Sequence, residues 1–385
     1  CDELQITFLK MINENNYLFA VGDEDQCIYS FRGSKPEYMV TFDKIFNGGK
    51  KIYLSINYRS NENIVESSKE VIKHNLKRNN KIINSYKNTQ GIIKFSTPYD
   101  ERAQGEEISD IIEKSTYNVS ENAVLYRTNM EARSMIDTFT RRKIPFVLLD
   151  KGYNFFEHFI AKDILAYLQL AINIKDRESF LHIINKPFRY VSKSNLEYLR
   201  TYREDKCPFD ILIEKKDTPP YQAKKLDELR RDIIHLNKLS LSSAIQYVIT
   251  ELGYIDYLKE YAERYNQSID DLEDIVEEFK SGADGLKTII ELLTHVEKVK
   301  ESIEESKDVK DGVILSTIHG VKGMEFKNVF LINANEETIP HRSSMEENIE
   351  EERRLFYVGI TRAIDNLYIF SPKNQRGKFK EASRF

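Results

Sequence analysis

Apolar and polar positions follow one another along most of the chain in a pattern that predicts strands separated by helices. The strands are short apolar runs, rich in β-branched and aromatic residues and bounded by polar turns. These runs are residues 17–21, 51–56, 92–95, 123–126, 146–149, 313–316, 328–332 and 367–370. Because strands that alternate with helices form parallel sheets, the pattern predicts an α/β fold.

Apolar residues that recur every three or four positions predict helices between these strands. These helices are residues 104–115, 130–142 and 159–173, a first helix with Leu4, Phe8, Leu9 and Ile12, a helix capped by Ser60 or Asn61 with Ile64, Val65, Val71, Ile72 and Leu76 on one face, and a helix with an acidic first turn that begins at Asn348. From residue 176 to about 308 the strand signal nearly vanishes, and amphipathic helices such as 269–279 and 286–299 dominate. We therefore expect an all-helical segment that interrupts the α/β part.

Residues 77–91 are polar, rich in lysine and asparagine, and indicate a domain boundary. The predicted domains are 1–91, 92–175, 176–308 and 309–385, of which the second and fourth are two parts of one α/β domain. We expect only sparse polar contacts between the first domain and the α/β domain, which would let the two move apart.

The composition is that of an ordinary soluble protein, because 41% of the 385 residues are hydrophobic and 31% are charged. No apolar run approaches the length of a membrane span. The three cysteines are widely scattered, which argues against a disulfide framework or a zinc site and indicates a reducing, cytoplasmic setting. A net charge of -5 means that any nucleic-acid binding is local. The chain begins with Cys1 and is interpreted as a piece of a longer protein.

Residues 21–33 combine two kinds of chemistry in one loop. Ligands bind beyond the carboxyl ends of parallel strands, so the polar residues 23–26 are expected to touch a ligand. Tyr29 and Phe31 share a face if the chain is extended, and Arg32 stands beside them. Aromatic rings with a guanidinium form a stacking platform for unpaired bases. The alternative is a polar turn followed by an edge strand that buries both aromatic side chains.

A second polar loop, residues 317–326, carries His319 and Glu325. Taken alone, His319 is more often a structural histidine and Glu325 a solvated carboxylate. The helix that begins at Asn348 runs to Arg362, and alone it is typical of a surface helix with alternating charge.

Six segments, in this order, resemble motifs of superfamily 1 DNA helicases of the UvrD/Rep/PcrA type. They are residues 21–33 (motif III), Asn57-Tyr58-Arg59-Ser60 (motif IV), residues 124–129, residues 155–157 with Lys162 and Asp163, residues 317–326 (motif V) and residues 351–363 (motif VI). The whole chain is similar to the carboxy-terminal portion of such a helicase. The resemblance implies a RecA-like P-loop NTPase core domain (2A), split by an all-helical insert (2B) and preceded by a remnant of the first RecA-like domain (1A).

The resemblance also implies an ATP site in the cleft between two RecA-like domains. Arg59 and Arg362 would approach the γ-phosphate from two sides, where charge develops on the transferring phosphoryl group. Gln26 would sense the γ-phosphate, Tyr58 would stack on adenine, and Glu325 would lie near the ribose. The implied catalytic residues are Gln26, Arg59 and Arg362, and the implied cofactor of the full-length parent is ATP with Mg²⁺.

Single-stranded DNA is the second ligand that the resemblance implies. Tyr29, Phe31 and Arg32 would meet the single strand, and most relatives have Trp where Phe31 stands. Backbone phosphates would be contacted by Arg127, Asn129, Thr317 and His319. The implied partners are single-stranded DNA, junctions of single- and double-stranded DNA, and repair or replication proteins, with no membrane.

The sequence departs from a complete motor of this family. No Gly-x-x-x-x-Gly-Lys-Ser/Thr phosphate loop occurs, no magnesium-binding acidic box is found, and Asp2 and Glu3 are not read as metal ligands. We therefore expect the chain alone to be inactive. In the helical part, Tyr190-Val191-Ser192 stands where many relatives have Gly-Ile-Gly, whose glycines let a backbone approach duplex DNA closely.

The sequence thus predicts the carboxy-terminal part of an ATP-dependent, 3′-to-5′ translocating DNA helicase, with the polarity taken from the family. Two alternatives stay open: a non-catalytic DNA-binding and protein-interaction module, and a subunit of a helicase-nuclease. Gln26, Arg59 and Arg362 favour the motor, because a binding module has no use for residues that sense a γ-phosphate.

Overall fold

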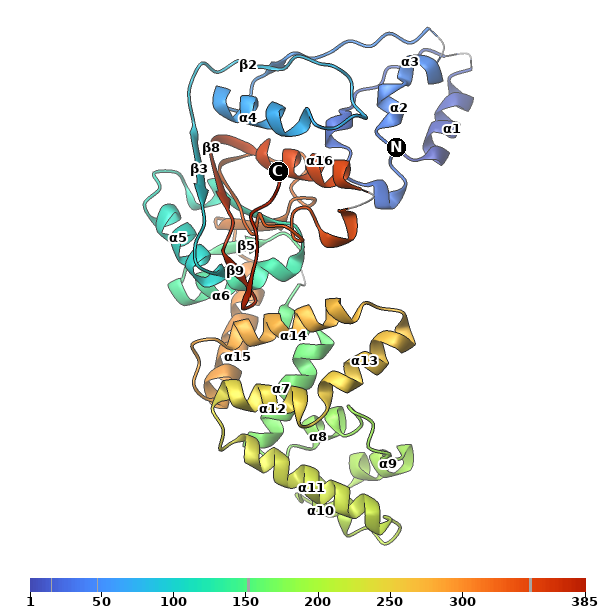
Figure 1. The fold of residues 1–385 in the computed structure, drawn as a ribbon, viewed down its shortest axis with the longest axis vertical. Helices are drawn as coiled ribbons and strands as arrows, with labels where there is room; N and C mark the ends of the chain where they lie inside the picture. The colour runs from blue at the N-terminus through green and yellow to red at the C-terminus, as the bar shows by residue number, and fades with distance from the viewer. Residues whose placement is uncertain (15, 47, 151–152, 346–347) are drawn as a thin grey trace. The chain divides into compact units, whose positions relative to one another are not determined.

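The computed structural model describes residues 1–14, 16–46, 48–150, 153–345 and 348–385. The chain divides into two compact units, a first unit of Cys1–Gly152 with Glu305–Phe385 and a second unit of Tyr153–Glu304. All strands of the described residues lie in the first unit, and the second unit is helical (Figure 1).

A six-stranded parallel sheet lies at the centre of the first unit, with the strand order β3-β8-β7-β4-β6-β5. The strands are β3 (Ile92–Ser96), β4 (Asn122–Tyr126), β5 (Phe146–Leu148), β6 (Val313–Thr317), β7 (Phe326–Leu331) and β8 (Ala363–Phe370). Val124 of the inner strand β4 pairs with Leu315 of β6 and Phe330 of β7. Every residue of β4 is buried, as is typical of a parallel strand covered on both faces. The prediction of an α/β fold with a parallel sheet is confirmed.

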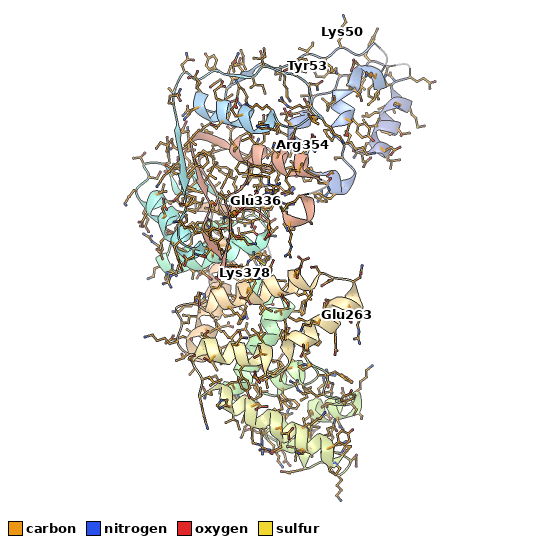
Figure 2. The ribbon with its side chains drawn as sticks, in the orientation of Figure 1. Lys50, Tyr53, Glu263, Glu336, Arg354 and Lys378 are labelled. Carbon is orange, nitrogen blue, oxygen red and sulfur yellow. The ribbon has the colours of Figure 1, made fainter. Side chains whose placement is uncertain are left out.

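Helices cover both faces of this sheet. They are α4 (Glu62–Ile72) and α16 (Ile349–Ile360) on one side and α5 (Glu101–Glu113) and α6 (Ala132–Arg142) on the other (Figure 1). Asp100 caps the start of α5, and its side chain accepts a hydrogen bond from the Ala103 N–H at 2.8 Å. Figure 2 shows Arg354 of α16 inside the unit, where it is 5% exposed, and Lys50 at its surface.

Shorter elements complete the first unit. They are α1 (Glu3–Ile12), α2 (Glu37–Val40), α3 (Phe42–Ile45), β1 (Ile56–Asn57), β2 (Asn84–Ser85), β9 (Asn374–Gln375), β10 (Lys378–Phe379) and the 3₁₀ turns η1 (Glu24–Gln26), η2 (Ser30–Arg32), η3 (Val119–Glu121), η4 (Asn129–Glu131) and η6 (Arg342–Ser344). Strands β1 and β2 pair in parallel, and β9 and β10 pair antiparallel.

Helix α4 shares the hydrophobic core of the sheet. Its residues Ile64 and Ile72 belong to the same cluster as Leu355 of α16 and Leu367 of β8. The expectation that only sparse polar contacts link the residues before 91 to the α/β domain is therefore wrong for α4. The predicted buried face of this helix forms, except that Leu76 lies beyond the helix end and is 88% exposed.

Two predicted strands near the start of the chain do not form as expected. Residues 17–21 are in no strand, and Tyr17 and Phe19 are 107% and 89% exposed. Of the strand predicted at 51–56, only Ile56 lies in a strand, β1. A strand needs a neighbour that pairs its N–H and C=O groups, and no strand among the described residues runs beside 17–21. Apolar composition alone cannot reveal whether that neighbour is present.

The second unit is built of helices. They are α7 (Phe159–Ile172), α8 (Arg177–Ile183), α9 (Lys193–Thr201), α10 (Pro208–Ile213), α11 (Pro220–Leu236), α12 (Leu241–Thr250), α13 (Tyr254–Tyr265), α14 (Ile269–Ala283) and α15 (Ile289–Ser306), with the 3₁₀ turn η5 (Phe155–Glu157) before α7. Helix α7 packs against α8, α11, α12 and α14. The predicted α/β part includes residues 159–173, whereas the structure groups α7 with the helical unit. The four-domain division as a whole stays a prediction.

Tyr190 stands where many relatives have the first glycine of Gly-Ile-Gly, and it has a backbone conformation that glycine adopts easily. Its φ is 62°, in the left-handed region, and its side chain is 64% exposed. The Gln222 side-chain amide donates to the Tyr190 carbonyl at 2.8 Å, and the Asn185 amide donates to the Val191 carbonyl at 2.8 Å. The turn therefore has a glycine-like backbone that carries a large ring.

Candidate functional site

Arg362 is a buried cation between α16 and β8. Its side chain is among the largest that are fully buried, and the residue is 1% exposed. The guanidinium donates to the carbonyl oxygens of Val358 at 3.0 Å and Met324 at 3.1 Å and to the Thr361 hydroxyl at 3.1 Å. Burial, and then the charge of Arg59, lower the pKa of Arg362 to about 10. Arg362 is thus still a cation at neutral pH, held in place by oxygen acceptors.

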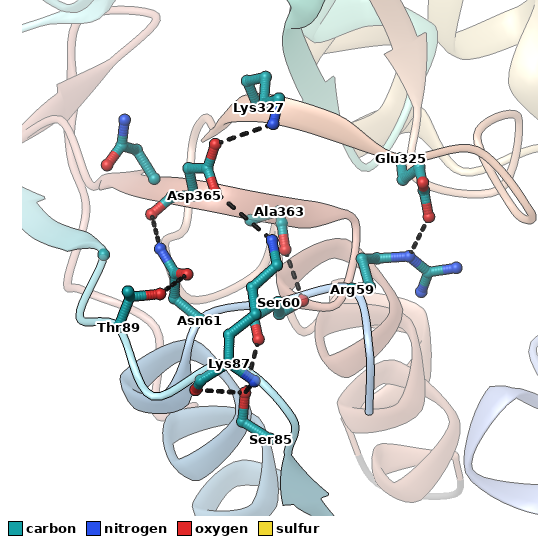
Figure 3. Close-up of polar contacts among 12 residues, drawn as sticks. Arg59, Ser60, Asn61, Ser85, Lys87, Thr89, Glu325, Lys327, Ala363 and Asp365 are labelled. Carbon is teal, nitrogen blue, oxygen red and sulfur yellow. Dashed lines mark hydrogen bonds and ion pairs between the residues drawn. The ribbon is translucent and has the colours of Figure 1, made fainter. Parts of the chain in front are cut away.

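Arg59 lies beside Arg362. Its Nε donates to the Glu325 carboxylate at 2.6 Å (Figure 3). Its Nη1 donates to the Thr361 carbonyl at 3.3 Å. Three of the predicted ATP-binding residues, from segments far apart in the sequence, therefore meet in one place. Two guanidiniums that repel each other form a site suited to an anion with several charges.

The backbone around Arg59 is fixed by polar contacts with β8. The Ser60 hydroxyl donates to the Ala363 carbonyl at 2.6 Å, and the Asn61 amide donates to the Asp365 carbonyl at 3.3 Å (Figure 3). Both side chains therefore bond to backbone carbonyls at the start of β8. The segment that carries Arg59 is thereby joined to the start of β8, which follows Arg362 directly.

Tyr58 presents a ring at the surface next to this arginine pair. It is 66% exposed, and its ring centroid lies 5.0 Å from that of Tyr86. The exposure leaves a face that can stack on a flat ligand. Tyr86 was not predicted, because it lies in the polar segment interpreted as a domain boundary.

Gln26 ends the 3₁₀ turn η1. Its side-chain amide donates to Asp23 at 2.8 Å, and its carbonyl accepts a hydrogen bond from the Lys322 ammonium at 2.9 Å. The expectation that all of residues 23–26 touch a ligand is wrong for Glu24 and Asp25, which are 4% and 1% exposed. Their carboxylates are bound by cations of the same unit, which sequence spacing does not reveal.

The side chains of the predicted stacking platform lie together, although the backbone that brings them together is not the expected strand. Tyr29 and Phe31 lie at the start and middle of the turn η2, not on an extended strand, and their ring centroids are 5.9 Å apart. The Arg32 guanidinium lies 5.4 Å from each ring centroid. Phe31 is 69% exposed, so the alternative in which an edge strand buries both aromatics is wrong.

His319 adds a third ring to this platform. Its centroid lies 5.9 Å from that of Tyr29 and 6.0 Å from that of Phe31, and the Tyr29 hydroxyl donates to the His319 carbonyl at 3.2 Å. Burial, and then the charge of Arg127, lower the pKa of His319 to about 4. At neutral pH His319 is therefore an uncharged ring and not a cation for a phosphate.

The other predicted phosphate contacts stand at the ends of β4 and β6. Arg127 forms an ion pair with the buried carboxylate of Glu352, and its Nη2 lies 2.8 Å from a carboxylate oxygen. Thr317 uses its hydroxyl to accept a hydrogen bond from the Gly320 N–H at 3.2 Å. Asn129 has a buried side-chain oxygen without a hydrogen-bond partner among the described residues. The Arg127 guanidinium is thus already bound by the Glu352 carboxylate.

Besides Tyr86, three residues of the site were not predicted. The Lys322 ammonium lies 5.1 Å from the Tyr29 ring centroid, so this side chain contacts both the aromatic platform and the Gln26 carbonyl. Glu351 accepts hydrogen bonds from the Ser30 N–H at 2.9 Å and from the Ser30 hydroxyl. Arg354 donates to the Cys27 carbonyl at 2.9 Å. All three lie in the motif segments, where the sequence analysis gave none of them a role at the site.

Within the described ranges, no group of three or more His, Cys, Asp and Glu side chains could hold a metal ion. The helices were also compared with the length and apolarity needed to cross a membrane. None in the described part of the chain meets both requirements.

Family models match nearly the whole chain. The UvrD-like helicase C-terminal domain matches residues 52–374, and the UvrD/REP helicase N-terminal domain matches residues 1–47. The chain is similar to the putative ATP-dependent DNA helicase YjcD of Bacillus subtilis, with 35% identity over 384 residues that cover 96% of this chain and 50% of the relative.

Two further relatives carry the name ATP-dependent DNA helicase PcrA. The protein from Bacillus subtilis is 33% identical over 380 residues, covering 92% of this chain and 51% of its own length. The protein from Staphylococcus epidermidis is 32% identical over 391 residues, covering 96% and 53%. The chain spans about half the length of the curated relatives it matches. Since a family model covers most of its residues, the chain belongs to the UvrD-like helicase family.

Proposed function

We propose that this chain is the carboxy-terminal part of an ATP-dependent DNA helicase that moves 3′ to 5′ along single-stranded DNA. The observation that carries the proposal is the meeting of Arg59, Glu325 and Arg362, each from a segment that resembles a different helicase motif. The names of the relatives support ATP and DNA as ligands of the parent protein. The polarity of translocation rests on the resemblance alone. The proposed cellular location is the cytoplasm.

In this proposal, the first unit from β1 onwards corresponds to the second RecA-like domain (2A), and the helical unit corresponds to its insert (2B). The remnant of the first RecA-like domain (1A) ends before β1 and not at residue 91, because α4 shares the core of the sheet. The exposed apolar side chains of residues 17–21 and of Ile52 and Leu54 support this limit. Such exposed apolar segments fit strands that pair with neighbours in the half of the relatives that this chain does not cover.

ATP would bind with its phosphates against the arginine pair. Both guanidiniums are already held by oxygen acceptors, so little reorganisation is needed when charge develops on the γ-phosphate. Gln26 would read the γ-phosphate and Tyr58 would stack on adenine. ATP, with Mg²⁺, supplies the phosphoryl group that is transferred to water. Because the sequence has no phosphate loop, the chain alone is expected to turn over no ATP.

Single-stranded DNA would lie against the platform of Tyr29, Phe31 and Arg32. Lys322 supports a coupling between this platform and the nucleotide, because one ammonium contacts both Tyr29 and the Gln26 carbonyl. His319 would contribute its ring to stacking. Arg127 would reach a phosphate only after leaving Glu352.

Unwinding of tailed duplexes by the parent protein tests this function. With ATP, we expect a duplex with a 3′ single-stranded tail to be opened and one with a 5′ tail to stay closed. The chain alone should open neither. A parent protein that hydrolyses no ATP on single-stranded DNA, or that opens only 5′-tailed duplexes, would contradict the proposal.

A further inference from the structure

Three consecutive carboxylates stand in the turn next to Gln26. Glu24 and Asp25 are 4% and 1% exposed, and Asp23 adds a partly buried third charge. A buried carboxylate is costly unless a cation or several donors satisfy it. The partners of these carboxylates come from a segment more than fifty residues further along the chain, directly after α4.

Residues 78–81 contact this turn through their basic side chains. Arg78 donates to Asp25 from Nε at 3.1 Å and from Nη2 at 2.9 Å. The Lys81 ammonium lies 2.5 Å from Asp23, 3.3 Å from Glu24 and 3.0 Å from Asp25. The Lys81 side chain is only 10% exposed. Burial lowers the pKa of Lys81, but the carboxylates of Asp23 and Asp25 outweigh burial and raise it above its ordinary value. Lys81 is thus a fixed cation at the centre of the cluster.

Asp23 connects this cluster to Gln26. Its Oδ1 faces Lys81 at 2.5 Å and accepts the Asp25 N–H at 3.1 Å, while its Oδ2 accepts the Gln26 amide at 2.8 Å. The carboxylate is therefore held through one oxygen and orients the Gln26 side chain through the other. Without Lys81, Asp23 would stand beside Glu24 and Asp25 while Arg78 is held on Asp25, and the repulsion between like charges would drive Asp23 towards water.

We propose that Lys81 is a positioning residue for Gln26 and acts through Asp23. The segment after α4 then fixes the group that reads the γ-phosphate. This inference rests on the proposed function, because Gln26 has a γ-phosphate to read only if the parent binds ATP. A hydrogen-bonding side chain recognises a developing or resting charge best when it is held in place before the ligand arrives.

The ratio of the affinities for a non-hydrolysable ATP analogue and for ADP, measured in the parent helicase, tests this role. Lys81→Met is expected to lower this ratio about tenfold, as when one hydrogen bond to a charged group is lost. Lys81→Arg should restore much of it. Lys77→Met is the matched control, because Lys77 is an exposed lysine of the same segment that pairs with Glu37 at 2.7 Å and should leave the ratio unchanged.

Two further variants distinguish a failure of the proposed γ-phosphate role of Gln26 from a failure of the positioning role of Lys81. Gln26→Ala should lower the ratio at least as much as Lys81→Met, and an unchanged ratio in Gln26→Ala would overturn the γ-phosphate role itself. If Gln26→Ala lowers the ratio and Lys81→Met does not, the positioning role is wrong. Should Lys81→Met fail to fold, Asp23→Asn with Lys81→Met keeps the net charge of the cluster. In this double variant a lowered ratio supports the inference and an unchanged ratio overturns it.

Discussion

His319 shows how much a single residue depends on what the fold places around it. The resemblance assigns it to a phosphate, and an exposed histidine could serve there as a cation. In the structure, burial and Arg127 lower its pKa to about 4, and its ring packs against Tyr29 and Phe31. The phosphate contact stays a prediction, and the charge state of His319 is set by neighbours that the sequence does not place beside it.

The low pKa of His319 predicts a stability change with pH. The unfolded chain protonates this histidine near pH 6.5, whereas the folded chain does so near its pKa of about 4. Between these values the unfolded state binds the extra proton, so lowering the pH should destabilise the fold by about 3 kcal/mol in total. Urea unfolding followed by circular dichroism at pH 7 and pH 4.5 should show a larger loss in the native chain than in His319→Gln. Equal losses would mean that His319 is not buried in this way.

Among the elements, α4 is the one before residue 91 that packs into the core of the sheet. Its Ile64 is fully buried in a cluster with residues of α16 and β8, and Leu76, just beyond its end, is exposed. Ile64→Ala should therefore lower the free energy of unfolding by about 2–5 kcal/mol. Leu76→Ala should change it by less than about 0.5 kcal/mol. Urea unfolding of both variants measures the difference, and similar values would show that α4 does not belong to the core of the sheet.

The regular elements of the sheet could be predicted because their signals are local. Strands β4 and β6 are short apolar runs next to helices, and both form within a residue or two of the expected positions. Residues 17–21 carry the same signal but form no strand, because a strand also needs a partner. The pairing of Arg78 and Lys81 with residues 23–25 is not predicted from the sequence. Ion pairs between residues far apart along the chain produce no periodic pattern that a sequence reading could detect.

At the scale of the whole molecule, the proposed motor depends on more than this chain contains. The chain spans about half of its relatives, and its sequence has no phosphate loop. What it does contain is the proposed side of a nucleotide site, in which Arg59 and the 1% exposed Arg362 lie together with Glu325. The central claim is therefore that this arginine pair serves the γ-phosphate of ATP bound by the parent.

Turnover of ATP by the parent helicase on single-stranded DNA tests that claim most directly. Arg59→Ala and Arg362→Ala should each lower kcat by about 10³ or more, as expected when a guanidinium that stabilises phosphoryl transfer is removed. Arg141→Ala is the control, because Arg141 is an exposed arginine of α6 paired with Glu106, and its kcat should stay at the native value. If both site variants are folded and their kcat stays within about tenfold of the control, well short of the loss expected for such an arginine, the arginine pair does not act on the γ-phosphate and the account is wrong.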